Sequence, residues 1–386
     1  MHRLSLCLIL FSISYNLTTH ATFADEPWID KIDLFGAGQG GYETFRIPGI
    51  VVTNKGTVLV YCEARRGSRS DWADIEVFLC RSTNGGKTWS PPWKIADSKK
   101  DTVNNPVAIV DRDSDRIHFL YCINYHQCFY MYSDDDGISF SEPREITAAF
   151  EPFRKEYDWG VLATGPGHGI QLKNGRLLVP VWMSTATREH RPSAVSTIYS
   201  DDHGTTWKNG EIVCAHPDPL INPSETIAVQ LSDGTVQLNI RSENREYRRA
   251  ISNSKDGATG WSSVTMHDGL YEPICMAGIT HLPKPFADND STFLFSNPYS
   301  ENNPGRHGKH EFRHRENLTV RMSTDDCKTW PVSRSLEPGI SGYSDLAIGH
   351  NGTIYCVYER GGDDGFAHKF LTLARFNRAW VEAGDE

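Results

Sequence analysis

Apolar and polar residues alternate in short stretches along most of the chain. Clear examples are residues 75–81, 196–200 and 318–323. Alternation with a period of two is typical of β-strands that bury one face. Other strand-like runs begin after an Asn-Gly or Asp-Gly pair, as after residues 174–175 and 351–352, and such pairs favour tight turns. The pattern therefore predicts many short strands that are joined by tight turns.

A short motif with the template Ser-x-Asp-x-Gly-x-Thr-Trp, which we call the Asp box, occurs in five copies. They are residues 82–89, 133–140, 200–207, 254–261 and 323–330. The short polar side chains can bind backbone amides, Gly permits a positive φ and the aromatic ring packs below, so the motif predicts a hairpin turn. The alignment places Asn84 at the Asp position, Ala258 and Gly260 at the Gly and Thr positions, and Cys327 at a Gly position. We expect the Asp boxes to be structural turns without chemistry of their own.

The Asp boxes divide the chain into units of roughly 50 to 70 residues, each with several predicted strands. Strand units of this size that repeat around an axis form a β-propeller. With about 60 residues per blade, the chain after its N-terminal segment would form about six blades. We therefore predict an all-β fold, a six-bladed β-propeller that occupies residues 25–386 as a single domain.

The first 24 residues have the pattern of a signal peptide. A basic start at Met1-His2-Arg3 is followed by an apolar run that is too short to span a bilayer, and small residues suit cleavage after Ala24. A buried N-terminal strand is the alternative, but the three features agree on a signal peptide. No later stretch approaches a membrane span. The sequence therefore predicts an exported protein, secreted or periplasmic.

Composition and charge narrow the possible partners. The 32 Gly, 20 Pro and 11% aromatic residues favour an all-β fold, and the net charge of -10 argues against nucleic acid as a partner. The cysteines beyond Cys7 include no Cys-x-x-Cys pair, so we expect no zinc site and no other cofactor. Cys122 with Cys128, or Cys62 with Cys80, are spaced for disulfides, although core packing of free thiols explains them at least as well.

The segment Phe45-Arg46-Ile47-Pro48, followed by several Asp boxes, resembles the exo-sialidase (neuraminidase) family of six-bladed propellers. The resemblance extends from about Gly40 to Arg375. Many other propellers carry Asp boxes, so the ordered set of chemical residues between the boxes is the more specific feature. The resemblance implies a hydrolase that releases terminal α-linked sialic acids from glycans, glycoproteins or glycolipids.

A sialic acid bears a carboxylate on its anomeric carbon, and this group determines what the site must contain. The fork of an Arg side chain binds a planar carboxylate with paired, charge-assisted hydrogen bonds. By resemblance, Arg46, Arg241 and Arg315 match the three Arg residues that bind the substrate carboxylate in the family. Glu359 matches the Glu that holds the first of them, and Arg65 resembles a further Arg near the 4-position of the sugar.

The same carboxylate would repel an anionic nucleophile, and sialidases use a tyrosine instead. Tyr343 matches this nucleophile. Glu225 matches the carboxylate that accepts the phenolic proton, which is needed because a phenol with a pKa of about 10 is a weak nucleophile at neutral pH. Asp71, in a Ser-Asp-Trp loop, matches the general acid/base. The resemblance thus implies a retaining exo-α-sialidase with a covalent sialyl-tyrosine intermediate.

Two other functions stay open. A trans-sialidase, or a hydrolase of another nonulosonic acid, would keep the same residues. A non-catalytic Asp-box propeller that serves as a binding module would need neither Tyr343 nor Asp71, so their presence argues against it.

The sequence leaves several residues near the predicted site without a definite role. His168, in a glycine-rich segment, is expected to be fixed by hydrogen bonds to loop backbone. Trp159, Trp182 and Met183 are candidates for contact with the N-acetyl group of the sugar, and core packing explains them equally well.

Overall fold

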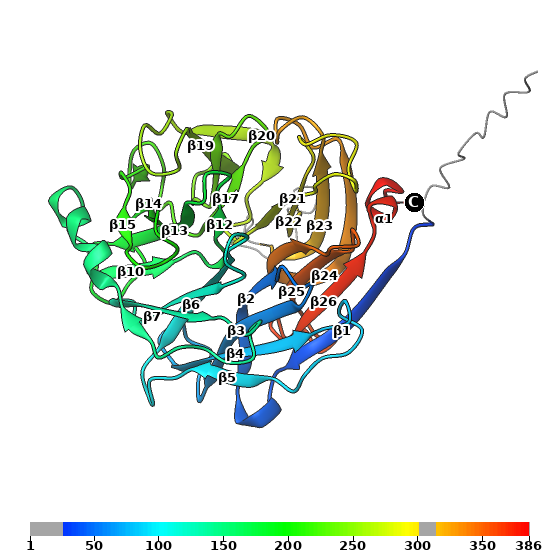
Figure 1. Cartoon of the computed structure of the whole chain (residues 1–386), viewed down its shortest axis with the longest axis horizontal. Coiled ribbons are helices and arrows are strands. Elements are labelled where there is room, and N and C mark those ends of the chain that lie inside the picture. Colours follow the sequence, from blue (N-terminus) through cyan, green and yellow to red (C-terminus); the bar gives the residue numbers. More distant parts are fainter. Residues whose placement is uncertain (1–25, 301–313, 386) are drawn as a thin grey trace, which may run out of the picture.

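The computed structural model describes residues 26–300 and 314–385, so the predicted signal peptide lies outside the described residues. Antiparallel groups of strands surround a common centre (Figure 1). The first group contains β2 (Thr44–Val52), β3 (Val58–Arg66), β4 (Asp74–Ser82) and β5 (Trp93–Ala96). The second contains β6 (Val103–Val110), β7 (Ile117–Ile123), β8 (Gln127–Ser133) and β9 (Arg144–Glu145), with the short parallel strand β11 (Gly167–His168).

The third and fourth groups continue around the ring. The third contains β10 (Val161–Thr164), β13 (Leu177–Ser184), β14 (Ser193–Ser200) and β15 (Lys208–Asn209), and also β12 (Ile170–Gln171) and β16 (Cys214–Ala215). The fourth contains β17 (Thr226–Gln230), β18 (Val236–Ile240), β19 (Arg248–Ser254) and β20 (Thr265–Tyr271).

The long strand β24 (Val332–Ile348) belongs to two groups. Its first part pairs with β23 (Glu316–Ser323), beyond which lie β22 (Phe293–Pro298) and β21 (Gly278–His281). Its second part, from Ser341, pairs with β25 (Ile354–Arg360), which is followed outward by β26 (Phe370–Phe376) and β1 (Ile29–Gly36). The pairing therefore defines six groups, in agreement with the predicted six-bladed propeller.

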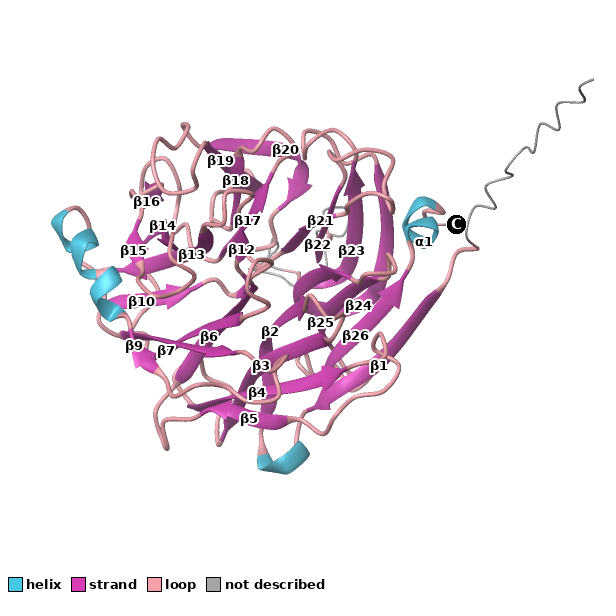
Figure 2. Cartoon of the chain, in the orientation of Figure 1, coloured by secondary structure: helices cyan, strands magenta, loops and turns pink. Residues whose placement is uncertain are grey.

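The pairing of β1 with β26 closes the ring, because the first strand of the chain completes the group formed by the last ones. Helices are few and lie at the periphery (Figure 2). Those in the described residues are η1 (Gln39–Gly41), η2 (Thr147–Ala149), η3 (Glu151–Lys155) and α1 (Arg378–Glu382). No helix in the described part of the chain is long and apolar enough to cross a membrane.

The apolar faces of neighbouring groups pack against one another and form the core. One cluster joins β2, β3 and β25, and includes Phe45, Val60 and Val357. All eight cysteines of the described chain are free and buried. Cys122 and Cys128 are cross-strand partners in β7 and β8, yet they are not bonded, so core packing is the interpretation that the structure confirms.

Each Asp box forms the predicted turn. In the third copy, Gly204 N donates to Ser200 Oγ (2.9 Å) and Thr206 N donates to Asp202 Oδ1 (2.8 Å). In the first copy Asn84 Oδ1 accepts the equivalent bond from Thr88 N (3.0 Å), because an amide oxygen can replace a carboxylate oxygen here.

The predicted alignment of the fourth Asp box is wrong by one residue. Thr259, and not Gly260, donates its backbone amide to Asp256 Oδ1 (2.8 Å). Gly257, with a φ of 73°, takes the place of the template Gly. The turn is one residue shorter than in the other copies, so the fixed spacing of the template misplaced Ala258 and Gly260.

Three Asp boxes also join their group to the preceding one through a side chain. The residue after the template Asp makes the contact in each case. Asp136 Oδ1 accepts from Thr53 Oγ1 (2.6 Å), His203 Nδ1 lies 2.7 Å from Asp111 Oδ2, and Asp326 Oδ2 accepts from Ser232 Oγ (2.6 Å). The Asp boxes therefore stabilise contacts between groups as well as individual hairpins.

Candidate active site

The eight predicted site residues lie together at the N-terminal ends of the inner strands. Six of them line a cavity of about 160 Å³, namely Arg46, Asp71, Glu225, Arg241, Arg315 and Tyr343. Arg46 lies in β2 and Tyr343 in β24, whereas Glu225, Arg241 and Arg315 adjoin β17, β18 and β23. Strands from different groups thus bring distant segments of the chain to one place.

The side chains of Tyr343, Glu225 and Arg241 form one hydrogen-bonded unit. Tyr343 Oη donates to Glu225 Oε1 at 2.6 Å. Arg241 Nη1 donates to Tyr343 Oη at 2.8 Å and also binds Glu225 Oε2. Burial raises the pKa of Tyr343 well above its usual value, although the charge of Arg241 acts in the opposite direction. The phenol is therefore neutral at physiological pH, and Glu225 is in position to accept its proton.

Glu359 fixes Arg46 in the site. Arg46 Nε and Nη2 donate to the two oxygens of Glu359 at 3.0 and 3.3 Å. The backbone amides of Ile47 and Tyr343 each donate to Glu359 at 3.2 Å. Burial acts to raise the pKa of Glu359, but Arg46 and His368 outweigh it and hold that pKa well below the usual value. One buried carboxylate therefore orients the first Arg and also the backbone of the predicted nucleophile.

The guanidinium groups of Arg46 and Arg315 also lie next to the ring of Tyr343. The guanidinium carbons of Arg46 and Arg315 each lie 5.2 Å from the centre of the Tyr343 ring. Arg315 Nη2 donates to the carbonyl oxygen of Ile274 at 2.5 Å, and Arg315 has no carboxylate partner among the described residues. The charge of Arg315 is therefore available to an anion that enters the cavity.

Asp71 lies on the loop between β3 and β4, at the opening of the cavity. Its Oδ1 is 2.7 Å from Arg65 Nη1 and 3.7 Å from Arg46 Nη1, and its side chain is 41% exposed. Arg65 in turn binds the buried Glu63 at 2.8 Å. Burial acts to raise the pKa of Asp71, but Arg65 and Arg46 outweigh it and lower that pKa. Asp71 is thus ionised in the free site.

The loop that carries Asp71 is held by aromatic contacts. The ring of Trp72 lies 4.6 Å from that of Tyr125 and 5.6 Å from that of His190, measured between centroids. Tyr125 is itself 6.0 Å from Trp182. Packing of these rings orders the loop and so fixes Asp71 next to the cavity.

Several lining residues were not predicted from the sequence. They are Ile47, Tyr125, His190 and Arg191. Asn105, whose segment 104–111 is expected from the sequence to shape the rim of the site, and Trp182, a candidate for contact with the N-acetyl group, also line the cavity. Trp159 and Met183 belong instead to a core cluster. Asn105 and Tyr125 have positive φ values of 54° and 53°, so irregular backbone turns them inward. In the sequence, only the Asn-Asn-Pro segment before Val107 indicates an irregular backbone of this kind.

His168 does not lie in this cavity, and the prediction for its partner is wrong. Its Nδ1 is 2.8 Å from Asp345 Oδ1, a side-chain carboxylate and not loop backbone.

Elsewhere in the described chain, one group of side chains has three potential metal-ligand atoms within 4.8 Å of one another. It consists of Asp111, Asp113 and His203. Asp113 N donates to Asp111 Oδ1 at 2.9 Å, and His203 binds the other oxygen of Asp111. These hydrogen bonds account for the closeness of the three side chains, which form a contact between neighbouring groups of strands.

Comparisons with known proteins agree with the fold and identify the family. The family of BNR repeat-like domains matches residues 56–356, and the chain belongs to this family. A sialidase of Micromonospora viridifaciens is 30% identical over 388 aligned positions, which cover 92% of this chain and 55% of that relative. A sialidase of Bacteroides fragilis (strain YCH46) is 29% identical over 357 positions, which cover 84% and 61%. The chain therefore spans little more than half the length of these two relatives.

A comparison with solved structures also finds a sialidase. The Hadza microbial sialidase Hz136 has a TM-score of 0.75 and 26% sequence identity, with 91% of this chain and 69% of that chain covered. The resemblance to the sialidase family that the sequence indicated is thereby confirmed.

Proposed function

We propose that the protein is a retaining exo-α-sialidase that hydrolyses terminal α-linked sialic acids through a covalent intermediate on Tyr343. The observation that carries the proposal is the 2.6 Å hydrogen bond from Tyr343 Oη to Glu225 Oε1, inside a cavity that Arg46, Arg241 and Arg315 also line. A phenol paired with a buried carboxylate is an activated nucleophile. The Arg residues select a substrate whose reacting carbon carries a carboxylate.

In the first step, Arg46, Arg241 and Arg315 would bind the substrate carboxylate and so place the anomeric carbon beside Tyr343. Tyr343 Oη would attack this carbon while Glu225 takes the phenolic proton. Asp71 would donate a proton to the glycosidic oxygen, which leaves as an alcohol. In the second step, Asp71 would act as a base toward water, which displaces Tyr343, and Glu225 would return the proton to the phenol oxygen. Two displacements restore the original configuration.

The charges around Asp71 suggest how it could become an acid. In the free site, Arg65 and Arg46 lower the pKa of Asp71 and keep it ionised. A substrate carboxylate bound to Arg46 offsets part of this positive charge. The pKa of Asp71 would therefore rise when substrate binds, which favours the protonated form needed for the first step.

The same residues could also transfer the sialyl group to a sugar acceptor instead of water. That water is the acceptor is therefore a separate part of the proposal.

We also propose, from the N-terminal sequence, that residues 1–24 direct export and that residues 25–386 are one catalytic domain. The substrates that fit this location are sialylated glycans, glycoproteins or glycolipids outside the cytoplasm.

The experiment that tests the function is an assay of free sialic acid released from α-linked sialyllactose, with and without lactose as an acceptor. Wild-type protein should release the free sugar, and the yield should not fall when lactose is added. Tyr343→Phe, which removes only one oxygen, should release none at a measurable rate. Saturable sialoside binding without release would instead support a binding module.

A further inference from the structure

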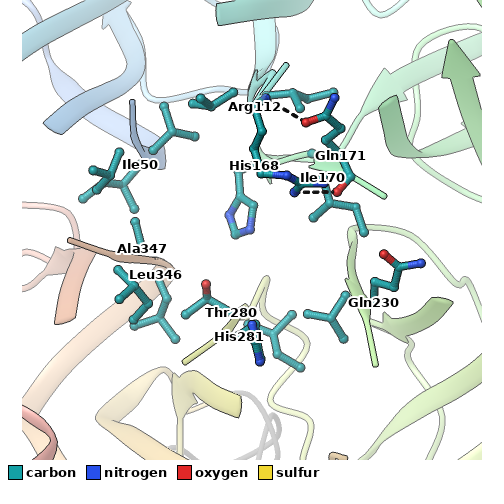
Figure 3. A pocket seen from close by; sticks show the side chains of 18 of the residues that line it. Ile50, Arg112, His168, Ile170, Gln171, Gln230, Thr280, His281, Leu346 and Ala347 are labelled. Atoms are coloured by element: carbon teal, nitrogen blue, oxygen red, sulfur yellow. Dashed lines mark hydrogen bonds between the residues drawn. The ribbon is translucent and has the colours of Figure 1, made fainter. Parts of the chain in front are cut away.

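A second cavity lies at the opposite ends of the inner strands (Figure 3). Its volume is about 640 Å³. The strand β2 carries Arg46 near its start and Ile50 near its end, and β24 likewise carries Tyr343 and then Leu346. The two cavities therefore occupy the two ends of the same central strands.

The two cavities have no lining residue in common. A tightly packed layer contains Gly167, where an added Cβ would meet Met276 Cε at 2.4 Å and Asp345 Cγ at 3.5 Å. No side chain fits at this glycine without displacing its neighbours. A molecule in the second cavity would therefore contact none of the residues that line the first one.

Aliphatic side chains form a large part of the wall of the second cavity. Different groups of strands each contribute an aliphatic side chain, namely Ile50, Ile109, Val229, Ile279 and Leu346. A concave site of a few hundred cubic ångströms, with apolar walls and a few polar groups, is typical of small-molecule sites.

The main polar group is His168, whose ring projects into the middle of the cavity (Figure 3). Its Nδ1 lies 2.8 Å from Asp345 Oδ1. The Asp345 carboxylate also accepts hydrogen bonds from the backbone amides of Ile50 (3.1 Å) and Leu346 (2.9 Å). Burial acts to lower the pKa of His168, but Asp345 outweighs it and the pKa is raised. No partner for His168 Nε2 occurs among the described residues, so this nitrogen is free to donate to a ligand.

The charge of the lining also favours an anion. Arg112 and Lys173 lie in the wall, and Arg112 is fixed there by the carbonyl oxygens of Gln171 (3.0 Å) and Leu172 (2.9 Å). The described residues that line the cavity include no Asp or Glu. This positive lining contrasts with the net charge of -10 for the chain.

We propose that the second cavity binds a small organic monocarboxylate with a compact apolar or aromatic body. The carboxylate accepts a hydrogen bond from His168 Nε2, and the body contacts the aliphatic wall. This site is independent of the proposed sialidase reaction, and it takes an anion that has no sugar ring.

The test is isothermal titration of the full chain with 2-naphthoate and, as a matched neutral ligand, 2-naphthamide. Excess N-acetylneuraminate is present to occupy the arginine site, which could also bind a carboxylate. We expect saturable binding of naphthoate, at least about tenfold tighter than that of the amide, since a charge-assisted hydrogen bond is lost with the amide. His168→Gln should remove the difference in affinity between the acid and the amide. Thr280→Trp, which fills the cavity, should weaken the binding of both ligands.

Thr280→Trp is the deciding variant if His168→Gln does not fold, because Thr280 is half-buried and lines the cavity. Thermal unfolding checks that each variant is folded. Equal affinity for acid and amide would overturn the proposal. Displacement of naphthoate by N-acetylneuraminate, or unchanged binding in Thr280→Trp, would place the ligand elsewhere and overturn it as well.

Discussion

Tyr343 and Glu225 are 118 residues apart in the sequence, yet Tyr343 Oη donates a 2.6 Å hydrogen bond to Glu225 Oε1. Both side chains are buried, and Arg241 binds both of them. In the proposed mechanism, the carboxylate would accept a proton while the guanidinium would stabilise the negative charge that develops on the phenol oxygen. This pair is the part of the molecule on which the proposed chemistry depends.

Replacement of Glu225 by Gln keeps the shape of the side chain but removes the base. The rate constant kcat for a sialoside should fall by roughly 10²- to 10⁴-fold, the usual contribution of a general base. Glu243→Gln is the matched control, since Glu243 forms an ion pair with Arg191 and does not contact Tyr343. Near wild-type turnover in Glu225→Gln would assign the base to another residue.

Replacement of Arg315 by Lys keeps the charge but loses the planar fork. Binding of free sialic acid should weaken by about 1–3 kcal/mol, the cost of a charge-assisted hydrogen bond left unmade. Titration calorimetry measures this change directly. Arg375→Lys serves as the control, because Arg375 lies in β26 and binds Gly85 O and Asp30. Equal affinity of Arg315→Lys and wild-type protein would exclude Arg315 from the carboxylate site.

Asp71→Ala should be selective in its effect. A sugar is a poor leaving group and needs a proton, whereas nitrophenolate leaves without one. The ratio kcat/KM for a sialyl-galactoside should fall by roughly 10²- to 10⁴-fold, and the fall for an aryl sialoside should be much smaller. Asp74→Ala, at the start of β4, should change both values alike. The same loss on both substrates in Asp71→Ala would indicate a structural role.

The ion pair between His203 and Asp111 should make stability depend on pH. Its hydrogen bond to Asp111 raises the pKa of His203, so the stabilisation is fully present below the unfolded pKa of about 6.5. It is lost as the pH rises through the folded pKa. His203→Ala should therefore lower the melting temperature more at pH 5.5 than at pH 9.

The effect should be small, at most about 1 kcal/mol, because the His203 side chain is half exposed and the pair is screened by solvent. His126→Ala, at an exposed histidine without an ion pair among the described residues, provides the control. The same destabilisation by His203→Ala at both pH values would contradict the role of the ion pair.

Much of the fold was predictable from the sequence because strands and turns are local features. Alternating residues define each strand, and the Asp boxes define the hairpins that repeat around the axis. The fourth Asp box shows the limit of this approach. Its turn is shorter by one residue, and the role of Gly257 became clear only from the backbone conformation and the bond between Thr259 and Asp256.

The predicted site residues could be found for a different reason, because each stands in a short sequence motif that resembles one of the sialidase family. Tyr125 and His190 have no such motif and reach the cavity from irregular loops. Their positions depend on packing against Trp72, which no spacing in the sequence reveals. The contact of His168 with Asp345 was missed for the same reason, because it joins two blades.

The stereochemistry of the first product tests the central claim most directly. If Tyr343 attacks the anomeric carbon and water then displaces it, two inversions leave the released sialic acid in the α configuration. Proton NMR spectra recorded in the first minutes of the reaction, before mutarotation, should show the α anomer of the free sugar. Initial release of the β anomer would mean a single displacement by water and would contradict a covalent intermediate on Tyr343.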